Sequence, residues 1–377
     1  MNIKWGASFI FFLFVLSYLT YSSYQNRVYD WDMPGYLGSI YSWDYPNDAE
    51  KVHSLTYSSI KEEASPEKYK DIISLNLPNK VFEKDYLAFT EQLPYYQIKV
   101  GYNALIYTVH KIGFSGPTSL FIVNFLAYFI SGLLIFYFLM SLFQKYYLVA
   151  PIISISILSL PVLREMAENP TPDILSFVLL LLFIIYVLQK RSATTQFIIL
   201  LISVLIRPDY IIFALSYLFL AIFFRFIKEN KKVDFSLIGQ ALVMVIVYLI
   251  IIKYYHYPGW NDVFYDTFIH RRPVISAEPA NFTFKQYWDL LIFKLVNFKR
   301  ITIVSSIILI AIFFVSKDLF VRMLSSLVFL NIYFKFLLFP QGGTLRFFLG
   351  FVIILFLILI YAVSTKNIKL FKLKKIS

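Results

Sequence analysis

The chain has 377 residues, of which 59% are hydrophobic, 20% are aromatic and only 15% are charged. Soluble domains usually carry about 25% charged residues, so this composition is typical of a membrane protein with several spans. The absence of cysteine excludes disulfide bonds and thiolate chemistry. The net charge of +12 fits positively charged cytoplasmic loops and does not indicate nucleic-acid binding, since no soluble basic module is present.

Ten apolar segments are candidates for membrane-spanning helices, because a span needs about 20 mostly apolar residues. The first follows Lys4 and lacks the short core and small-residue cleavage site of a signal peptide, so we expect an uncleaved helix. The sequence thus predicts an all-α polytopic membrane protein of about ten spans, forming one domain over 1–377. The expected spans are 5–24, 118–143, 147–163, 174–189, 195–206, 210–227, 235–254, 301–316, 319–338 and 347–364.

The charges sort to one side of these spans if the N-terminus is cytoplasmic. Only three acids accompany the basic residues of the inner turns, namely Glu229, Asp234 and Asp318. This bias predicts that both termini are cytoplasmic and that the long loops 25–117 and 253–300 lie outside. The inner basic residues are Lys4, Lys145, Lys190, Arg191, Arg225, Lys228, Lys231, Lys232, Lys317, Arg322 and five lysines between 366 and 375.

Both long loops are rich in aromatic residues and are expected to be folded. Prolines at positions 46, 66, 78 and 94 divide the first loop into short segments. Helical apolar spacing over 80–93, 99–111 and 282–300 predicts short helices that lie along the membrane surface. We find no internal repeat, which would have favoured a transporter built from inverted halves.

An acidic, aromatic stretch, YDWDMPGY, opens the first loop directly after the first predicted span. Its carboxylates, Asp30 and Asp32, share a side in an extended or turn conformation. One could then accept a proton from a hydroxyl while the other orients an acceptor or holds a metal ion. Pro34 and Gly35 predict a turn after Asp32. The simpler alternative is a pair of solvated loop carboxylates.

Arginines occupy the outer turns, on the side where the positive-inside bias disfavours them. They are Arg164, Arg207 and Arg346 in the short turns, and Arg271 and Arg272 in the second loop, where they follow His270. The planar guanidinium fork matches phosphate, so these turns indicate capture of an anionic lipid head group.

Local pairing is the simpler alternative for two of these arginines. Arg207 could pair with Asp209 and Arg164 with Glu168, whereas the other arginines have no acid within a few residues. For Asp173, which follows two prolines, the alternative is stabilisation of a helix N-terminus. Lys335 is expected to snorkel to the interface and is given no role.

Taken together, these features resemble the GT-C superfamily of membrane glycosyltransferases, which use polyprenyl-phosphate-linked sugars. The resemblance covers most of residues 1–350. In that family the first-loop acid often appears as an adjacent pair, whereas Trp31 separates Asp30 from Asp32, so the identity of the base stays open. The segments that carry the resemblance are YDWDMPGYLG, KVGYNALIYTVHKIGFSGPTSLFIVNFLAYFISGLLIFYFL, ENPTPDILSFVLLLLFIIY, LIRPDY and GGTLRFFLGF.

The resemblance implies an inverting glycosyltransferase of the bacterial plasma membrane, with its site on the extracytoplasmic face. Asp32, with Asp30 as its rival, would be the general base, and Asp173 would approach from the second acidic turn. The resemblance leaves open whether a divalent cation, Mg²⁺ or Mn²⁺, assists, and Asp30 or Asp32 would be its ligand. Donor binding would fall to Trp31, Tyr36, Arg207, His270, Arg271, Arg272 and Arg346.

The acceptor could be a glycan, a lipid or a protein. Two other functions stay open, a flippase or transporter of a lipid-linked sugar, and a polysaccharide polymerase or ligase of another fold. Charged turns on one face only disfavour transport. The acid after the first span favours the glycosyltransferase.

Overall fold

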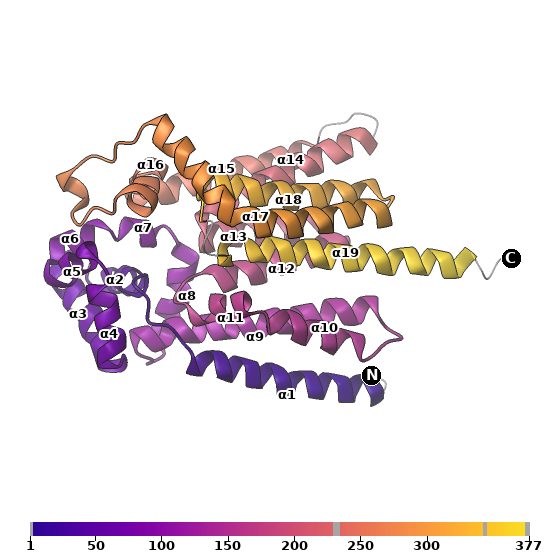
Figure 1. Ribbon diagram of the computed structural model, residues 1–377, viewed down its shortest axis with the longest axis horizontal. Coiled ribbons are helices and arrows are strands. Elements are labelled where there is room, and N and C mark those ends of the chain that lie inside the picture. The colour runs from indigo at the N-terminus through magenta and orange to yellow at the C-terminus, as the bar shows by residue number, and fades with distance from the viewer. Residues whose placement is uncertain (1–2, 229–233, 342–344, 374–377) are drawn as a thin grey trace.

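The computed structural model describes residues 3–228, 234–341 and 345–373, and every regular element within these ranges is a helix (Figure 1). The prediction of an all-helical chain is therefore confirmed. The elements are α1 (Ile3–Gln25), α2 (Met33–Asp44), α3 (Ala49–Glu63), α4 (Pro66–Ser74), α5 (Leu77–Lys84), α6 (Tyr86–Glu91), α7 (Pro94–Gln97), α8 (Val100–Lys111), α9 (Gly116–Leu142), α10 (Val149–Leu158), α11 (Pro161–Glu168), α12 (Asp173–Leu188), α13 (Ala193–Ile206), η1 (Pro208–Tyr210), α14 (Ile211–Lys228), α15 (Phe235–Tyr254), α16 (Trp260–Phe264), η2 (Tyr265–Ile269), η3 (Ile275–Ala277), α17 (Phe284–Val315), α18 (Leu319–Leu338) and α19 (Arg346–Leu373).

Seven helices of the described chain are long and apolar enough to cross a membrane, which fits a polytopic membrane protein. The bent pair α10 and α11, which meet at 62°, would make an eighth if counted as one span. The remaining two predicted spans form α12 and α13, with 16 and 14 residues. At 1.5 Å per residue, these helices fall short of a hydrocarbon core about 30 Å thick. The predicted count of about ten spans is therefore too high by this criterion. The seven are α1, α9, η1 with α14, α15, α17, α18 and α19.

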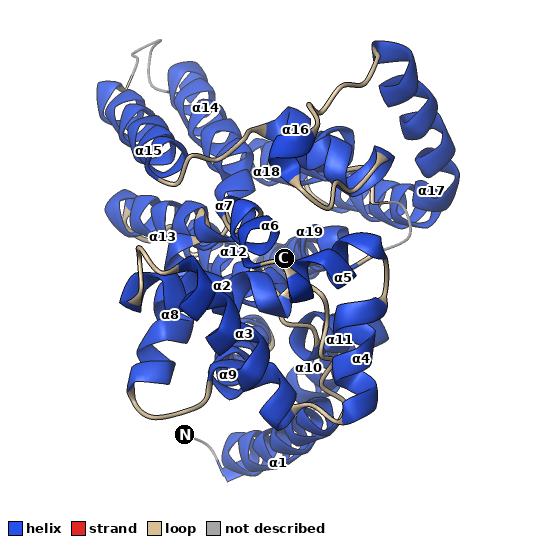
Figure 2. Cartoon of the chain, turned by 90° about the vertical axis from the view of Figure 1, so that its left-hand side faces the viewer, coloured by secondary structure: helices blue, strands red, loops and turns tan. Residues whose placement is uncertain are grey.

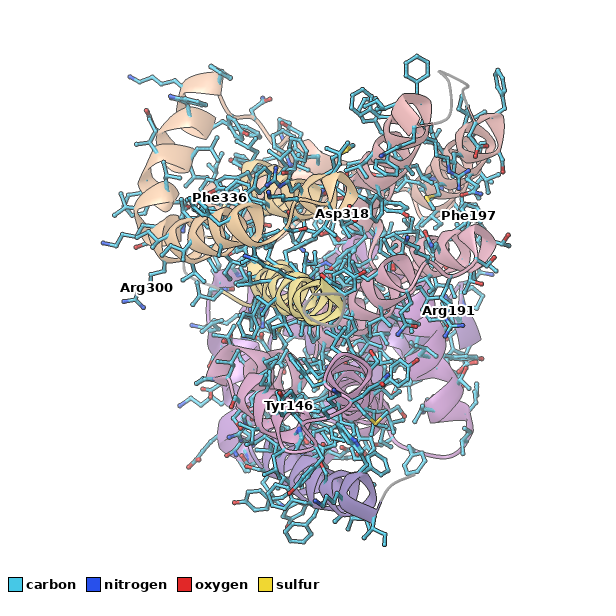
Figure 3. All side chains as sticks on the ribbon, turned by 90° about the vertical axis from the view of Figure 1, so that its right-hand side faces the viewer. Tyr146, Arg191, Phe197, Arg300, Asp318 and Phe336 are labelled. Carbon is cyan, nitrogen blue, oxygen red and sulfur yellow. The ribbon has the colours of Figure 1, made fainter. Side chains whose placement is uncertain are left out.

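The long helices form a bundle, with the loop helices gathered at one end (Figure 1). The start of α1 and the end of α19 both lie at the opposite end. Figure 2 looks onto the loop helices, and Figure 3 looks onto the other end, where Tyr146 and Arg191 mark two of the basic turns. The predicted inner residues Glu229, Lys231 and Lys232 lie outside the described residues, as do Lys374 and Lys375. Which end faces the cytoplasm stays a prediction from the charges.

Prolines set the helix starts of the first loop. Pro66, Pro78 and Pro94 lie in the first turns of α4, α5 and α7, where the missing N–H is not needed and φ is already helical. The predicted helix over 80–93 is instead two helices, because Asp85 interrupts it and accepts the N–H groups of α6. The predicted helix over 99–111 is confirmed as α8.

The second loop contradicts one predicted boundary. The surface helix expected over 282–300 and the span expected over 301–316 form a single helix, α17, of 32 residues. It begins at a capping box in which Thr283 and Gln286 bond to each other's backbone. No glycine or proline occurs between 284 and 315, so nothing in the local sequence ends the helix near Arg300.

The absence of cysteine allows a direct test of topology. Asn47→Cys, in the exposed turn after α2, and Ser192→Cys, in the exposed turn between α12 and α13, leave the core untouched. With the N-terminus inside, an impermeant thiol reagent should label Asn47→Cys in intact cells and Ser192→Cys only after the membrane is opened. The reverse labelling pattern would place the loop helices in the cytoplasm.

Candidate active site

A cavity of about 730 Å³ opens among the loop helices and the nearby ends of α12, α14, α18 and α19. This volume lies in the range of small-molecule binding sites. Nine of the ten residues predicted for the site line it, although they come from segments far apart in the chain. They are Asp30, Trp31, Asp32, Tyr36, Asp173, Arg207, Arg271, Arg272 and Arg346.

His270 is the predicted residue that does not line this cavity. Its ring lies 3.4 Å from Glu278 Oε1, and 58% of its side chain is exposed. The residues that flank it in the chain explain this placement. The buried side chain of Arg272 holds the backbone of the second loop, which turns His270 outward.

Asp32 lies at the start of α2, but it does not cap this helix through its side chain. Its Oδ1 accepts a hydrogen bond of 3.0 Å from the Tyr96 hydroxyl, and its Oδ2 lies 3.9 Å from Nη2 of Arg346. The turn predicted at Pro34 and Gly35 is wrong. Proline in the first turn starts a helix here, and this helix aims the Asp32 carboxylate at the cavity.

Gly35 allows the Tyr96 ring to lie directly against α2. A Cβ atom at position 35 would lie only 2.4 Å from two carbon atoms of this ring. The ring also meets Tyr36 edge-on at 5.1 Å between centroids. Tyr36 itself is 2% exposed, so its ring is not open for the predicted contact with the donor. Its hydroxyl accepts a hydrogen bond from Lys99.

The two acids of the first loop lie in different surroundings. Asp30 Oδ1 accepts the N–H of Trp31 at 2.6 Å. Burial, and then the neighbouring negative charge of Asp32, raise the pKa of Asp30 to about 6. A general base works best when its pKa lies near the working pH, so the raised pKa keeps Asp30 a candidate for the base. Asp32 stays a candidate through its position at the cavity.

Asp173 and Arg207 form a well-buried ion pair of the cavity wall. The Asp173 side chain is 3% exposed and pairs with Arg207 Nη1, while its Oδ2 accepts a hydrogen bond of 2.9 Å from Thr171. Arg207 Nε also contacts Asp209 at 2.9 Å, and Lys335 Nζ lies 3.3 Å from the same carboxylate. The local pairing of Arg207 with Asp209 is thus present, and Arg207 reaches the cavity already neutralised.

The pairing alternative also holds for Arg164, whose Nη2 lies 3.3 Å from Glu168 and 2.9 Å from the Ser22 hydroxyl. These contacts join α11 to α1. Arg164 does not line the cavity, so its role is in packing.

Arg346 stands between the two acidic turns. Its Nε lies 3.6 Å from Asp173 and its Nη2 lies 3.9 Å from Asp32, which are long for hydrogen bonds. Nε is buried and has no hydrogen-bond partner among the described residues. A buried donor without a partner is costly, so this atom is suited to an acceptor that a ligand brings. Gly342, Gly343 and Thr344, in the turn before it, lie outside the described residues.

The adjacent arginines of the second loop have different surroundings. Arg272 is fully buried and contacts Asp262 at 2.7 Å and Asp266 at 2.8 Å, and it also donates to the carbonyl oxygen of Glu278. Its donors are used within the loop, so the structure favours a packing role over the predicted phosphate binding.

Arg271 instead has no carboxylate partner within the described chain. Its guanidinium lies 4.0 Å from the ring centroid of Trp31 and donates to the Gln92 side chain at 3.2 Å. Stacking on an indole orients the guanidinium but leaves its charge unneutralised. Arg271 is therefore the predicted arginine that is best suited to bind an anion.

No protein-family model, curated protein or solved structure matches the chain. The resemblance to GT-C enzymes therefore rests on the quoted segments and stays a prediction.

Lys99 is a cavity residue that the sequence analysis missed. Its ammonium donates to the Tyr36 hydroxyl at 2.9 Å, lies over the Tyr96 ring, and has no ion-pair partner in the described part of the chain. Burial lowers its pKa to about 8. No signal in the sequence singles out Lys99, because the first loop contains seven other lysines.

Few side chains of the site could act as ligands of a metal ion. Among the described residues no group of three or more histidine, aspartate or glutamate side chains could hold one. Asp30 and Asp32 would be the two protein carboxylates available, and Mg²⁺ is often held by one or two carboxylates together with a substrate phosphate. The predicted cation therefore stays a prediction and would need the donor itself as a ligand.

The contrast between the adjacent arginines gives a matched test. Arg272→Ala leaves two acids without their buried cation, which costs roughly 3–5 kcal/mol, so the second loop should unfold locally and become sensitive to protease. Arg271→Ala should leave thermal unfolding and protease resistance close to those of the parent. Equal stability of both variants would contradict the packing role of Arg272.

Proposed function

We propose that the chain is a membrane glycosyltransferase that moves a sugar from a polyprenyl-phosphate donor to an acceptor hydroxyl. The observation that carries this proposal is the mixed lining of one cavity. The lining includes the carboxylates of Asp30 and Asp32 and three cationic groups, those of Lys99, Arg271 and Arg346. It also includes apolar side chains, those of Ile211, Ile212, Ile252, Leu338 and Phe339.

This combination matches a ligand with an anionic head and a hydrocarbon tail. The apolar residues come from helices of spanning length, so a lipid tail could enter from the bilayer. The phosphate would lie near Lys99, Arg271 and the unpartnered Nε of Arg346, because these groups have donors to offer. Arg207 and Arg272 would instead hold the wall in place through their carboxylate partners.

The reaction would be a direct displacement at the anomeric carbon. The acceptor oxygen attacks this carbon while Asp32, or Asp30 as its rival, accepts the hydroxyl proton. The bond between the anomeric carbon and the phosphate oxygen breaks, and its electron pair leaves with the polyprenyl phosphate. Cationic groups next to that oxygen stabilise the charge as it develops. Attack from the opposite side inverts the anomeric configuration.

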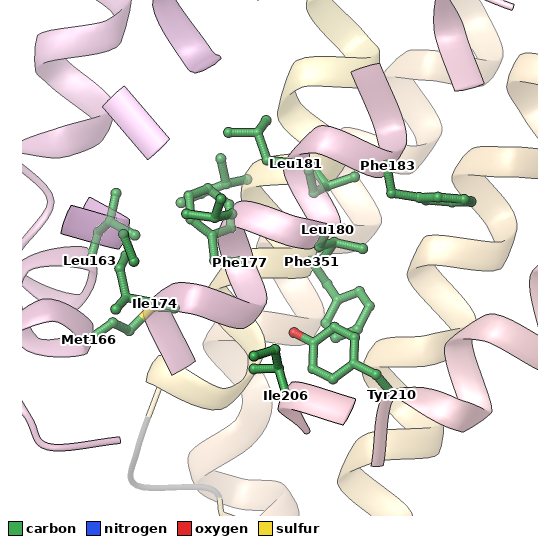
Figure 4. Close-up of a cluster of buried hydrophobic side chains, with 14 of the residues drawn as sticks. Leu163, Met166, Ile174, Phe177, Leu180, Leu181, Phe183, Ile206, Tyr210 and Phe351 are labelled. Atoms are coloured by element: carbon green, nitrogen blue, oxygen red, sulfur yellow. The ribbon is translucent and has the colours of Figure 1, made fainter. Parts of the chain in front are cut away.

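A flippase would need a polar path through the bundle. Within the bundle, a cluster of side chains contributed by α12, α19 and neighbouring helices is instead buried and largely apolar (Figure 4). Phe177, Leu181 and Phe351 are each at most 3% exposed, and this packing supports chemistry at one end of the bundle over passage through it. A polymerase or ligase of another fold stays a weaker alternative, for which we see no specific support.

The base is tested by substitutions that keep the shape of the side chain. Asp32→Asn should reduce sugar transfer from polyprenyl-phosphate hexoses by about a hundred- to ten-thousandfold, which is the usual contribution of a general base. Binding of polyprenyl phosphate should persist, since the cationic groups remain. Asp71→Asn, at an exposed site on α4, is the matched control and should keep parental activity.

Asp30→Asn distinguishes the two candidate bases. If Asp32→Asn turns over like the parent while Asp30→Asn is inactive, the role of base moves to Asp30. Full activity in both variants would remove these carboxylates from the reaction and argue against the proposal.

Lys99 gives the lipid-phosphate site a pH dependence. The ammonium is charged below its pKa of about 8, whereas a phosphate monoester is already fully ionised there, since its second pKa is about 6. Affinity for polyprenyl phosphate should therefore fall as the pH rises above about 8, with bound phosphate moving the loss to somewhat higher pH. Loss of a charge-assisted contact costs about 1.5–3 kcal/mol, or roughly tenfold or more in affinity.

The control for this prediction is Lys99→Met, which should bind weakly and without that step in the pH profile. Lys99→Arg should bind without the step because an arginine stays charged. The measurement is the dissociation constant for polyprenyl phosphate between about pH 7 and pH 10. If Lys99→Met keeps the same loss of affinity near pH 8, that loss belongs to another titrating group.

A further inference from the structure

A second cavity, of about 430 Å³, lies on the loop helices, and we call it the α3 groove. One stripe of α3 forms its floor, from Glu50 to Lys61 at helical spacing. Its sides come from Tyr69 of α4, Lys84 of α5 and Tyr86 of α6. None of its lining residues lines the larger cavity, so the two are separate sites.

A single layer of protein separates the α3 groove from the larger cavity. Phe82 belongs to this layer, because its side chain lines the larger cavity below Arg271 while its carbonyl oxygen accepts a hydrogen bond of 2.9 Å from His53 in the groove. A long substrate could therefore occupy the groove while its end reaches the larger cavity around this layer.

The floor of the groove is held rigidly. Phe89, which is fully buried, meets His53 at 5.5 Å and Tyr57 at 5.4 Å between ring centroids. The rings of His53 and Tyr57 also contact each other at 4.9 Å. A preformed floor lowers the ordering cost of binding, which is expected of a recognition site more than of a mobile surface.

The chemistry of the lining suits a carbohydrate. Tyr69 and Tyr86 offer ring faces for the C–H face of a sugar and hydroxyl groups for its polar edge, while Tyr57, 8% exposed, belongs to the floor. Ser54 and Ser58 add short hydroxyl groups between these rings. The lining contains no aliphatic side chain, so it does not suit a lipid tail or an apolar peptide. Lys61 and Lys84 outnumber Glu50, which favours an anionic partner.

We propose that the α3 groove binds an anionic oligosaccharide, as the acceptor of the reaction. This inference rests on the proposed function and narrows the acceptor class to a glycan. The groove would hold sugars distant from the reacting hydroxyl, and that hydroxyl would lie at Asp32 in the larger cavity.

The test uses the full chain in lipid nanodiscs, applied to an array of short bacterial cell-surface oligosaccharides, both acidic and neutral. The parent should bind acidic members in preference to neutral ones. Tyr69→Ser and Tyr86→Ser should each weaken this binding by about tenfold, the scale of one lost aromatic contact. Tyr146→Ser is the control, since Tyr146 is 62% exposed at the other end of the bundle and should not matter (Figure 3).

Folding of the groove variants is checked by binding of polyprenyl phosphate, which should match the parent. Asp32→Asn should bind the oligosaccharides like the parent, since it changes only the larger cavity. If no oligosaccharide binds the parent, if neutral members bind best, or if both groove variants bind acidic members normally, the inference is overturned. Groove-dependent binding without any use of polyprenyl-phosphate sugars would instead overturn the proposed transfer and leave a glycan-binding site.

Discussion

Charged side chains are buried at the end of the bundle that carries the loop helices, and the site depends on how this burial is stabilised. Removing an ion from water costs several kcal/mol even after relaxation, so each buried charge needs a partner. Arg207 meets this need by joining Asp173 at the start of α12 to Asp209 in the turn after α13. Arg346 extends the arrangement from Asp173 to Asp32, and so links α19 to the first loop.

The same constraint divides the cations of the cavity into two groups. Those with carboxylate partners hold segments together, as Arg272 does within the second loop. Lys99 and Arg271 lie against aromatic rings and have no ion-pair partner within the described residues. The wall therefore keeps positive charge that the protein does not neutralise, and an anionic ligand is the natural partner for it.

Contacts between the two long loops join them beside the cavity. The Tyr95 hydroxyl donates to Asp266 at 2.6 Å, and Ser276 donates to Glu91 through both its N–H and its hydroxyl. Segments separated by more than 150 residues in the chain thus form one wall.

The sequence by itself determined the helical class, the long apolar segments and nine of the 35 residues that line the cavity. These features are local, since apolar runs, prolines at helix starts and charges in outer turns are read from neighbouring residues. The sequence also indicated the local pairs of Arg207 with Asp209 and of Arg164 with Glu168.

Only the tertiary structure decided which charges are neutralised. Arg271 and Arg272 are adjacent and look alike in the sequence, yet only Arg272 meets two acids of its own loop. Lys99 and Tyr96 gain their places because Gly35 lets a ring approach α2 at a distance that no other residue would allow. Such contacts join residues far apart in the chain, and local patterns carry no information about their distances.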